Sequence, residues 1–316
     1  MTETHELDTK LFSPVKSFLE FPASLVLENV RAAIVGVPFD MGVAPVRVGS
    51  RLGPAAIREQ SEILDIYDPM EPDLDLYDTL NPVDCGDIVV WPGEREKSWE
   101  NIEQAVAQIA AAGTVPVSFG GDGSVSFPQA RALSKHHDGL VLLHFDAHTD
   151  VYPPPEQGAH TTGTTFTYAA MQGLFDTERS FHIGPRGPVS TARVFDHTRS
   201  FGYRIIPDAD LLRRGSADVI AEVKATIGNR PVYLCWDMDF YDPSCAPAVC
   251  NPTWGGITAR EGFELVRALS DINIVAVDIN TVSPPHDANG MTALLAGQTA
   301  LECLFVLARN LGAVQE

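Results

Sequence analysis

The chain has 316 residues, 45% of them hydrophobic, and its 22 Lys and Arg against 42 Asp and Glu give a net charge of −20 at pH 7. That hydrophobic fraction supports a globular fold of one large domain or two smaller ones. The negative charge argues against nucleic acid and anionic membrane as partners, because both bind basic surfaces, and it favours a small cationic ligand.

The beginning of the chain, MTETHELDTKLF, lacks a basic region followed by an apolar stretch, so no signal peptide is expected. No segment is expected to reach the length of apolar residues that a membrane helix needs. The cysteines form no CxxC pair and are odd in number, which favours reduced thiols. We therefore expect a cytoplasmic protein.

Residues 1–28 show weak periodicity and are expected to form an N-terminal arm, followed by a single domain over 29–316. In this domain, apolar runs of strand length alternate with helical segments. The predicted strands are RAAIVGVPFD, DIVVW, TVPVSFGG, GLVLLHFDAH, RSFHIGPRG, RPVYLCWDMDF and INIVAVDIN, and the chain closes with a long helix, MTALLAGQTALECLFVLARNLG. Strands that alternate with helices need crossover connections, so we expect an α/β fold with a parallel sheet covered on both faces.

Two of the predicted strands end in acidic side chains. In LLHFDAHTDVY, Asp146, His148 and Asp150 occupy alternate positions, so an extended backbone points all three to one face. In VYLCWDMDFYDP, Asp237 and Asp239 share the same spacing. Ligands of parallel sheets gather just beyond the carboxyl ends of the strands. Carboxylates that meet there need positive charge between them, which favours a pair of divalent cations.

The ligand set indicates which cations to expect. Four carboxylates and one imidazole make a hard, oxygen-rich site that suits manganese better than a thiolate or multi-histidine zinc site, with nickel or iron as alternatives. Two such cations that share a hydroxide provide a hydrolytic nucleophile at neutral pH. The other interpretation is that each cluster only caps a strand end, but two clusters on separate buried strands favour metal binding.

The motifs HFDAHTD and WDMDFYDPSCAP together resemble the paired signature motifs of the ureohydrolase family, which comprises arginases, agmatinases and related amidinohydrolases. GVPFDMGVAPVRVGSRLGPAAIRE is similar to a loop of agmatinase-type members, and DINTVSPPHDANGMTALLAG is similar to the family's last strand and closing helix. The resemblance covers nearly the whole chain. It implies a three-layer α/β/α fold with a parallel sheet of about eight strands, a catalytic domain over 29–316, and a homotrimer or hexamer.

The resemblance also implies a role for each metal-site residue. Asp146 and Asp237 would bridge the two metals. His148 and Asp239 would complete the coordination of one metal, and Asp150 would bind the other. Asp150, close to the attacking hydroxide, would also relay a proton to the leaving amine.

Two more residues are implied to act on the substrate. Glu261, in TAREG, matches a position where family members place an acid near the guanidinium group; its alternative is a first-turn acid favoured by the helix dipole. In PPPEQGAHTTGTTF, Thr162 aligns with a histidine that assists proton transfer in the family. His160, two residues earlier, would take over that catalytic role if the loop is longer, and is otherwise a solvated loop histidine.

One departure concerns a metal ligand. The family usually has Gly-Gly-Asp-His-Ser where this chain has GGDGS, so the ligand histidine is replaced by Gly123. The metal bound by Asp150 then keeps at most three protein ligands, and it binds weakly unless a water, a substrate atom or another residue fills the gap.

Three functions follow as hypotheses. The first is a metal-dependent hydrolase of a small cationic guanidino compound, agmatinase-like, in which metal-bound hydroxide attacks the guanidinium carbon and urea or an analogue is released. The second, motivated by Gly123, is a non-catalytic or half-active subunit in a hetero-oligomer with a homologous chain that has the full ligand set. The third is a deacetylase-like amide hydrolase, which the carboxylate count disfavours because such sites use more histidine and a single zinc.

Overall fold

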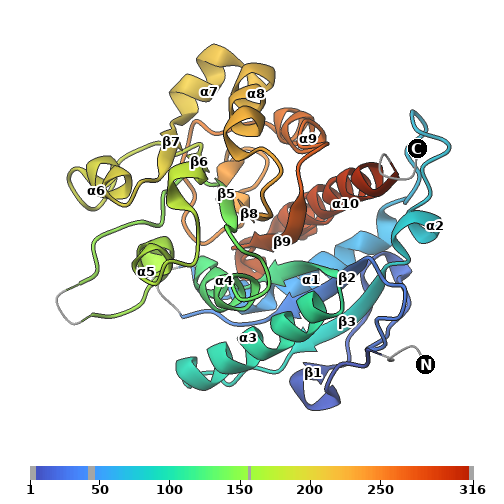
Figure 1. Ribbon diagram of the computed structural model, residues 1–316. Coiled ribbons are helices and arrows are strands. Elements are labelled where there is room, and N and C mark those ends of the chain that lie inside the picture. Colours follow the sequence, from blue (N-terminus) through green and yellow to red (C-terminus); the bar gives the residue numbers. More distant parts are fainter. Residues whose placement is uncertain (1–4, 42–46, 156–157, 313–316) are drawn as a thin grey trace.

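The computed structural model of the protein describes residues 5–41, 47–155 and 158–312. Within these residues nine strands form one sheet in the order β1-β3-β2-β4-β9-β8-β5-β6-β7 (Figure 1). The strands are β1 (Phe12–Ser13), β2 (Ala32–Val37), β3 (Val83–Ile88), β4 (Val115–Gly120), β5 (Val141–Phe145), β6 (Phe181–Ile183), β7 (Arg204–Ile206), β8 (Val232–Asp237) and β9 (Ile274–Asn280). Strands β2 to β9 are parallel to one another, and only β1 pairs antiparallel, with β3. The expected parallel sheet of about eight strands is confirmed.

Helices cover both faces of this sheet (Figure 1). The helices of the described residues are α1 (Gly53–Gln60), α2 (Leu76–Leu80), α3 (Arg95–Ala111), α4 (Ser126–Leu133), α5 (Thr165–Met171), α6 (Val194–Ser200), α7 (Asp208–Arg214), α8 (Ser216–Ile227), α9 (Ala259–Arg267) and α10 (Met291–Gly312). Successive residues of a strand point to opposite faces, so Ala32 and Ile34 join one buried apolar cluster while Ala33 and Val35 join the other. The first cluster includes side chains of α1, α2 and α7 to α10, and the second includes those of α3 to α5. The three-layer arrangement is therefore confirmed.

Residues 5–28 pack against the rest of the fold. Phe18 and Phe21 are buried in the same apolar cluster as α1 and α10, and β1 extends the sheet beyond β3. The backbone N–H of Phe18 donates to Asp84 Oδ2 at 2.8 Å. The N-terminal arm is thus held both by apolar packing and by the sheet edge.

One helix is long and apolar enough to cross a membrane by length and composition. It spans Ala288–Leu311, and 83% of its most apolar stretch is buried inside the molecule. The expectation that no segment reaches this composition is therefore wrong. The apolar residues of α10 belong to the core: Ala296, Ala300 and Leu304 are buried in the first apolar cluster.

Candidate metal centre

The acidic residues predicted from the sequence lie at the carboxyl ends of two strands that are neighbours in the sheet, β5 and β8. These ends line a cavity of about 830 Å³. Asp146, His148, Asp150, Asp237 and Asp239 all line it. The parallel sheet therefore brings together the two sequence clusters, as their spacing predicts.

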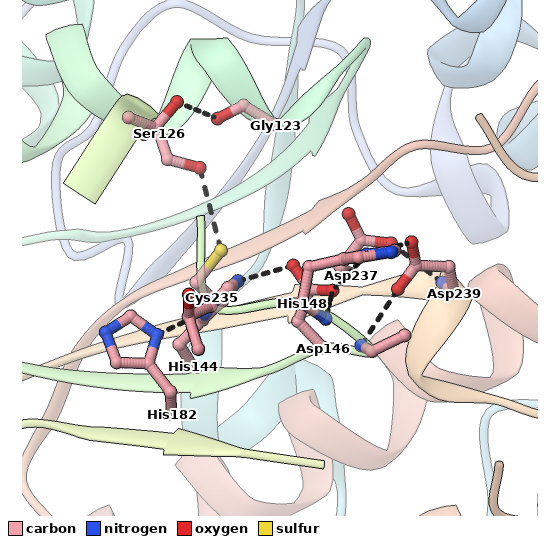
Figure 2. Close-up of polar contacts among 12 residues, drawn as sticks. Gly123, Ser126, His144, Asp146, His148, His182, Cys235, Asp237 and Asp239 are labelled. Atoms are coloured by element: carbon pink, nitrogen blue, oxygen red, sulfur yellow. Dashed lines mark hydrogen bonds and ion pairs between the residues drawn. The ribbon is translucent and has the colours of Figure 1, made fainter. Parts of the chain in front are cut away.

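His148 lies between two carboxylates. Its Nδ1 is 3.2 Å from Asp146 Oδ1 and 3.1 Å from Asp239 Oδ2 (Figure 2). Its Nε2 faces the other way, 3.0 Å from Asn251 Nδ2. A donor atom from each of Asp146, His148 and Asp239 lies within 4.8 Å of the others, so these three side chains can share one cation.

Backbone and hydroxyl donors hold two aspartates in place, Asp237 at the end of β8 and Asp239 just after it. Asp239 Oδ1 accepts from the N–H of Ala147 at 3.0 Å, which ties the end of β8 to that of β5. Asp237 Oδ1 accepts from the N–H of Asp239 at 2.7 Å and from the hydroxyl of Thr281 at 2.5 Å. One oxygen of each carboxylate is thus fixed by protein donors, which orients the group toward the cavity.

Sequence reasoning missed His144, which the sheet places behind Asp146. His144 Nε2 is 2.9 Å from Asp146 Oδ2, and its Nδ1 is 2.9 Å from Nδ1 of His182 on β6 (Figure 2). Neutral rings satisfy both contacts if His182 Nδ1–H donates to His144, whose Nε2–H then donates to Asp146. Donor atoms of His144, Asp146 and Asp150 also lie within 4.8 Å of one another. The spacing in the sequence could have identified His144 as a site residue, because it lies two positions before Asp146 and its side chain therefore points to the same face.

Burial and the closeness of like charges shift the pKa values of the aspartates at this site. Burial, followed by repulsion from Asp146, raises the pKa of Asp150 well above its usual range, and burial with repulsion from Asp239 does the same for the pKa of Asp237. Burial raises the pKa of Asp239 to about 6. Burial also opposes ionisation of Asp146, but His144 and His148 outweigh it, so its pKa lies well below its usual range.

The donor set fits a pair of divalent cations. It offers hard carboxylate oxygens and one imidazole nitrogen, the combination that suits manganese and related ions. Crowding keeps protons on carboxylates that would otherwise be ionised, and a divalent cation between them supplies the compensating charge. The ring nitrogen that faces the carboxylates, His148 Nδ1, is the atom that such a cation would use.

The other residues singled out from the sequence lie elsewhere. His160 does not line the cavity: its ring stacks on Tyr168 with centroids 3.6 Å apart and packs against Trp99 and Phe127. Burial, with a smaller effect of Arg95, lowers its pKa to about 4. Aromatic side chains thus cover part of His160, which is half-buried.

Glu261 also lies away from the cavity lining. Its Oε2 accepts from the N–H of Thr258 at 2.7 Å and from the Thr258 hydroxyl at 2.8 Å, while the Glu261 N–H donates back to that hydroxyl. This is a capping box at the start of α9. The contacts of Glu261 in this structure are therefore those of an acid in the first turn of a helix, the alternative interpretation of this residue. Part of the agmatinase-type loop, residues 42–46, and residues 156–157 before His160 lie outside the described residues.

The parallel sheet and its cluster of carboxylates define the class of a metal-dependent α/β hydrolase. A sequence model of the Arginase family matches residues 30–306, and the chain belongs to this family. The agmatinase of Serratia proteamaculans is 38% identical over 307 residues, which cover 96% of this chain and 97% of that protein. The agmatinase of Klebsiella pneumoniae is 39% identical over 311 residues, which cover 98% of each.

Solved structures agree with this assignment. Proclavaminate amidino hydrolase from Streptomyces clavuligerus has a TM-score of 0.88 at 28% identity and covers 96% of this chain and 100% of its own. Agmatine ureohydrolase of Thermoplasma volcanium has a TM-score of 0.81 at 27% identity and covers 96% of this chain and 97% of its own. The protein is thus a metal-dependent amidinohydrolase, an enzyme that cleaves C–N bonds of linear amidines. The alternative of a non-catalytic subunit has no support among these relatives.

Proposed function

We propose that the protein hydrolyses a small cationic guanidino compound of the agmatine type and releases urea or an analogue. The observation that carries this proposal is the cavity floor, where Asp146, Asp150, Asp237 and Asp239 meet. Such a set of carboxylates fits the divalent cations that amidine hydrolysis uses. Similarity to agmatinases along nearly the full chain supports the choice of substrate class.

Two divalent cations would lie in this floor, with manganese first and nickel as the alternative. Asp146 and Asp237 would contribute to holding both cations, His148 and Asp239 would complete the ligands of one, and Asp150 would bind the other. When bound there, the cations would lower the pKa of a water molecule so that it becomes a nucleophile at neutral pH.

The protein's own residues then orient the substrate and move a proton. The cavity above these carboxylates would hold the planar guanidinium group with its central carbon exposed to attack. Asp150 lines the cavity, and its backbone carbonyl is anchored by the N–H of Phe166 at 3.0 Å. We assign Asp150 as the proton carrier to the leaving nitrogen, in preference to His160, because Asp150 lines the cavity and His160 does not.

The cavity wall favours a substrate without a carboxylate tail. Among the described lining residues the only Lys or Arg is Arg47. Its Nε donates to the carbonyl of Val249 at 2.8 Å, and it also contacts the carbonyl of Pro247. Because its guanidinium is engaged by backbone carbonyls, it offers little to a substrate carboxylate, and an aminoalkyl tail fits better.

The test compares urea release from agmatine with release from 4-guanidinobutyrate, in which a carboxylate takes the place of the amine. The enzyme is loaded with Mn²⁺ or, separately, Ni²⁺. We expect the higher kcat/KM with agmatine. Preference for the guanidino acid, or no urea from either compound with two cations bound, would contradict the proposal.

Assembly and location are parts of the same proposal. We expect a homotrimer or hexamer in the cytoplasm, and light scattering on the purified protein measures the oligomer directly. A hetero-oligomer would instead appear as a second homologous chain that copurifies at fixed ratio.

A further inference from the structure

Gly123 leaves one side of the candidate cation site without a side chain. A Cβ placed on Gly123 would lie 2.9 Å from Thr162 Cγ2, 3.3 Å from Asp150 Oδ2 and 4.0 Å from Asn280 Oδ1. A side chain at this position would therefore point at the carboxylate of Asp150. The space next to Gly123 is bordered by a threonine methyl group and by two oxygen atoms.

Asn280 is the second of these oxygen donors, and its oxygen has no hydrogen-bond partner among the described residues. It is the last residue of β9, directly beside Asp237 in the register of β8 and β9. Only 1% of its surface is exposed. A buried amide oxygen without a partner is unfavourable, so its presence points to a ligand.

The orientation of this amide is fixed by its nitrogen. Asn280 Nδ2 donates to Asp278 Oδ2 at 3.2 Å. The same carboxylate accepts from Ser126 Oγ at 2.5 Å and from the hydroxyl of Tyr233 at 2.8 Å. Reversing the amide would place Asn280 Oδ1 against a carboxylate oxygen, and two acceptors repel each other. Oδ1 therefore stays on the side of Gly123.

We propose that Asn280 Oδ1 supplies the donor that Gly123 lacks, and completes the coordination of the cation held by Asp146, Asp150 and Asp237. This inference rests on the two-cation centre of the proposed function. An amide oxygen is a hard donor, and its use makes this half of the centre all oxygen. The substitution of oxygen for an imidazole nitrogen favours Mn²⁺ over Ni²⁺ at this position, because nickel prefers nitrogen ligands.

The experiment measures cation binding rather than turnover. Wild type and Asn280→Leu, which keeps a similar volume without a donor, are stripped of metal and titrated with Mn²⁺ by calorimetry. Electron paramagnetic resonance then separates a coupled Mn²⁺ pair from an isolated ion. The matched control is Asn273→Leu, an exposed asparagine immediately before β9. We expect two cations in wild type and in the control, and a second cation bound at least tenfold more weakly in Asn280→Leu.

A rescue variant tests the relation to Gly123. Gly123→His combined with Thr162→Ser, which removes the methyl group in the way, is expected to restore the second cation in the Asn280→Leu background and to raise affinity for Ni²⁺ relative to Mn²⁺. Should Asn280→Leu fail to fold, Asn280→Ala removes the same oxygen donor with a smaller side chain and serves the same purpose.

The outcomes separate the two proposals. Two cations bound equally tightly by wild type and by the Asn280 variant would overturn this inference and leave the proposed centre intact. Fewer than two cations in wild type would overturn the proposed centre itself, and this inference with it.

Discussion

The metal-free protein should lose stability as pH rises from 5 to 8. A carboxyl group whose pKa is higher in the folded than in the unfolded protein holds its proton better when folded, so its ionisation on raising the pH favours unfolding. Burial raises the pKa of Asp239 to about 6 from an ordinary 3.8, and burial also raises the pKa values of Asp150 and Asp237 well above their usual range. The pKa of His148 is also raised, because Asp239 and Asp146 outweigh its burial, and its contribution disappears as the imidazolium deprotonates.

Asp239 alone sets the scale of the effect. A shift from 3.8 to about 6 corresponds to about 3 kcal/mol of unfolding free energy, at about 1.4 kcal/mol for each tenfold change in proton affinity. About half of this share is lost below pH 5, so Asp239 contributes about 1.4 kcal/mol to the fall between pH 5 and 8, and the other groups add to it. The low pKa of Asp146 acts in the opposite sense but only below its unfolded value of 3.8, outside the range of the test.

The assay is urea denaturation of chelator-treated protein at several pH values, beside Mn²⁺-loaded protein and the metal-free Asp239→Asn variant. We expect the free energy of unfolding of the metal-free wild type to fall with pH, and the variant to show a shallower fall because one ionisation is removed. The loaded protein should not show the fall, since cations compensate the carboxylates. A metal-free wild type whose stability is constant or rises from pH 5 to 8 would refute the reasoning.

Three other substitutions test separate parts of the structure. Glu261→Ala removes half of a capping box, so we expect a loss of about 1 kcal/mol in thermal or urea unfolding and an unchanged KM; a large rise in KM would instead place Glu261 at the substrate. His160→Phe preserves the aromatic stack, and we expect kcat and its pH profile to stay as in wild type, whereas a drop in kcat with a shifted profile would support the proton-shuttle role. Arg58→Met leaves the buried carboxylate of Asp84 unpaired, and urea unfolding should show a loss of about 3 to 5 kcal/mol, with a loss below 1 kcal/mol counting against the burial of this pair.

The sequence predicted the parts of the fold that follow from simple periodicity. The alternate spacing of Asp146, His148 and Asp150 predicts that they share one face of a strand. The parallel arrangement of the strands predicts that these side chains lie close to Asp237 and Asp239. Most of the parallel strands are apolar runs, and these were found. The same spacing rule extends to His144, two residues before Asp146, but a single histidine inside an apolar run is also typical of a buried strand.

The strands that the sequence did not predict, or predicted with other bounds, differ from simple apolar runs for physical reasons. The strand expected at DIVVW is β3, Val83–Ile88, which begins four residues earlier and includes two acidic residues. Asp84 and Asp87 are tolerated there because Arg58 binds both, at 2.8 and 2.5 Å, and no local pattern reveals a partner from a distant helix. Strand β7 has only three residues, too few to show a period, and β1 has two.

The positions of the His160 and Glu261 side chains show another limit of prediction from the sequence. Both residue types are able to do the chemistry assigned to them, but the packing of neighbouring side chains decides where they point. Tyr168 and Trp99 hold the imidazole of His160, and Thr258 holds the carboxylate of Glu261. These contacts depend on three-dimensional packing, which spacing along the chain does not report.

The order of strands in the sheet has a consequence for biogenesis. Strands β8 and β9 are the last two made on the ribosome, yet they lie in the middle of the sheet, between β4 and β5. A nascent chain that ends before residue 232 therefore has its two halves of the sheet but not the residues that join them, and it has no complete set of cation ligands. The complete set of cation ligands thus exists only in the finished fold, and each tenfold excess of free cation over its dissociation constant adds about 1.4 kcal/mol per site to the stability of that fold. Metal supply in the cell would then set how much newly made chain stays folded, as well as how much is active.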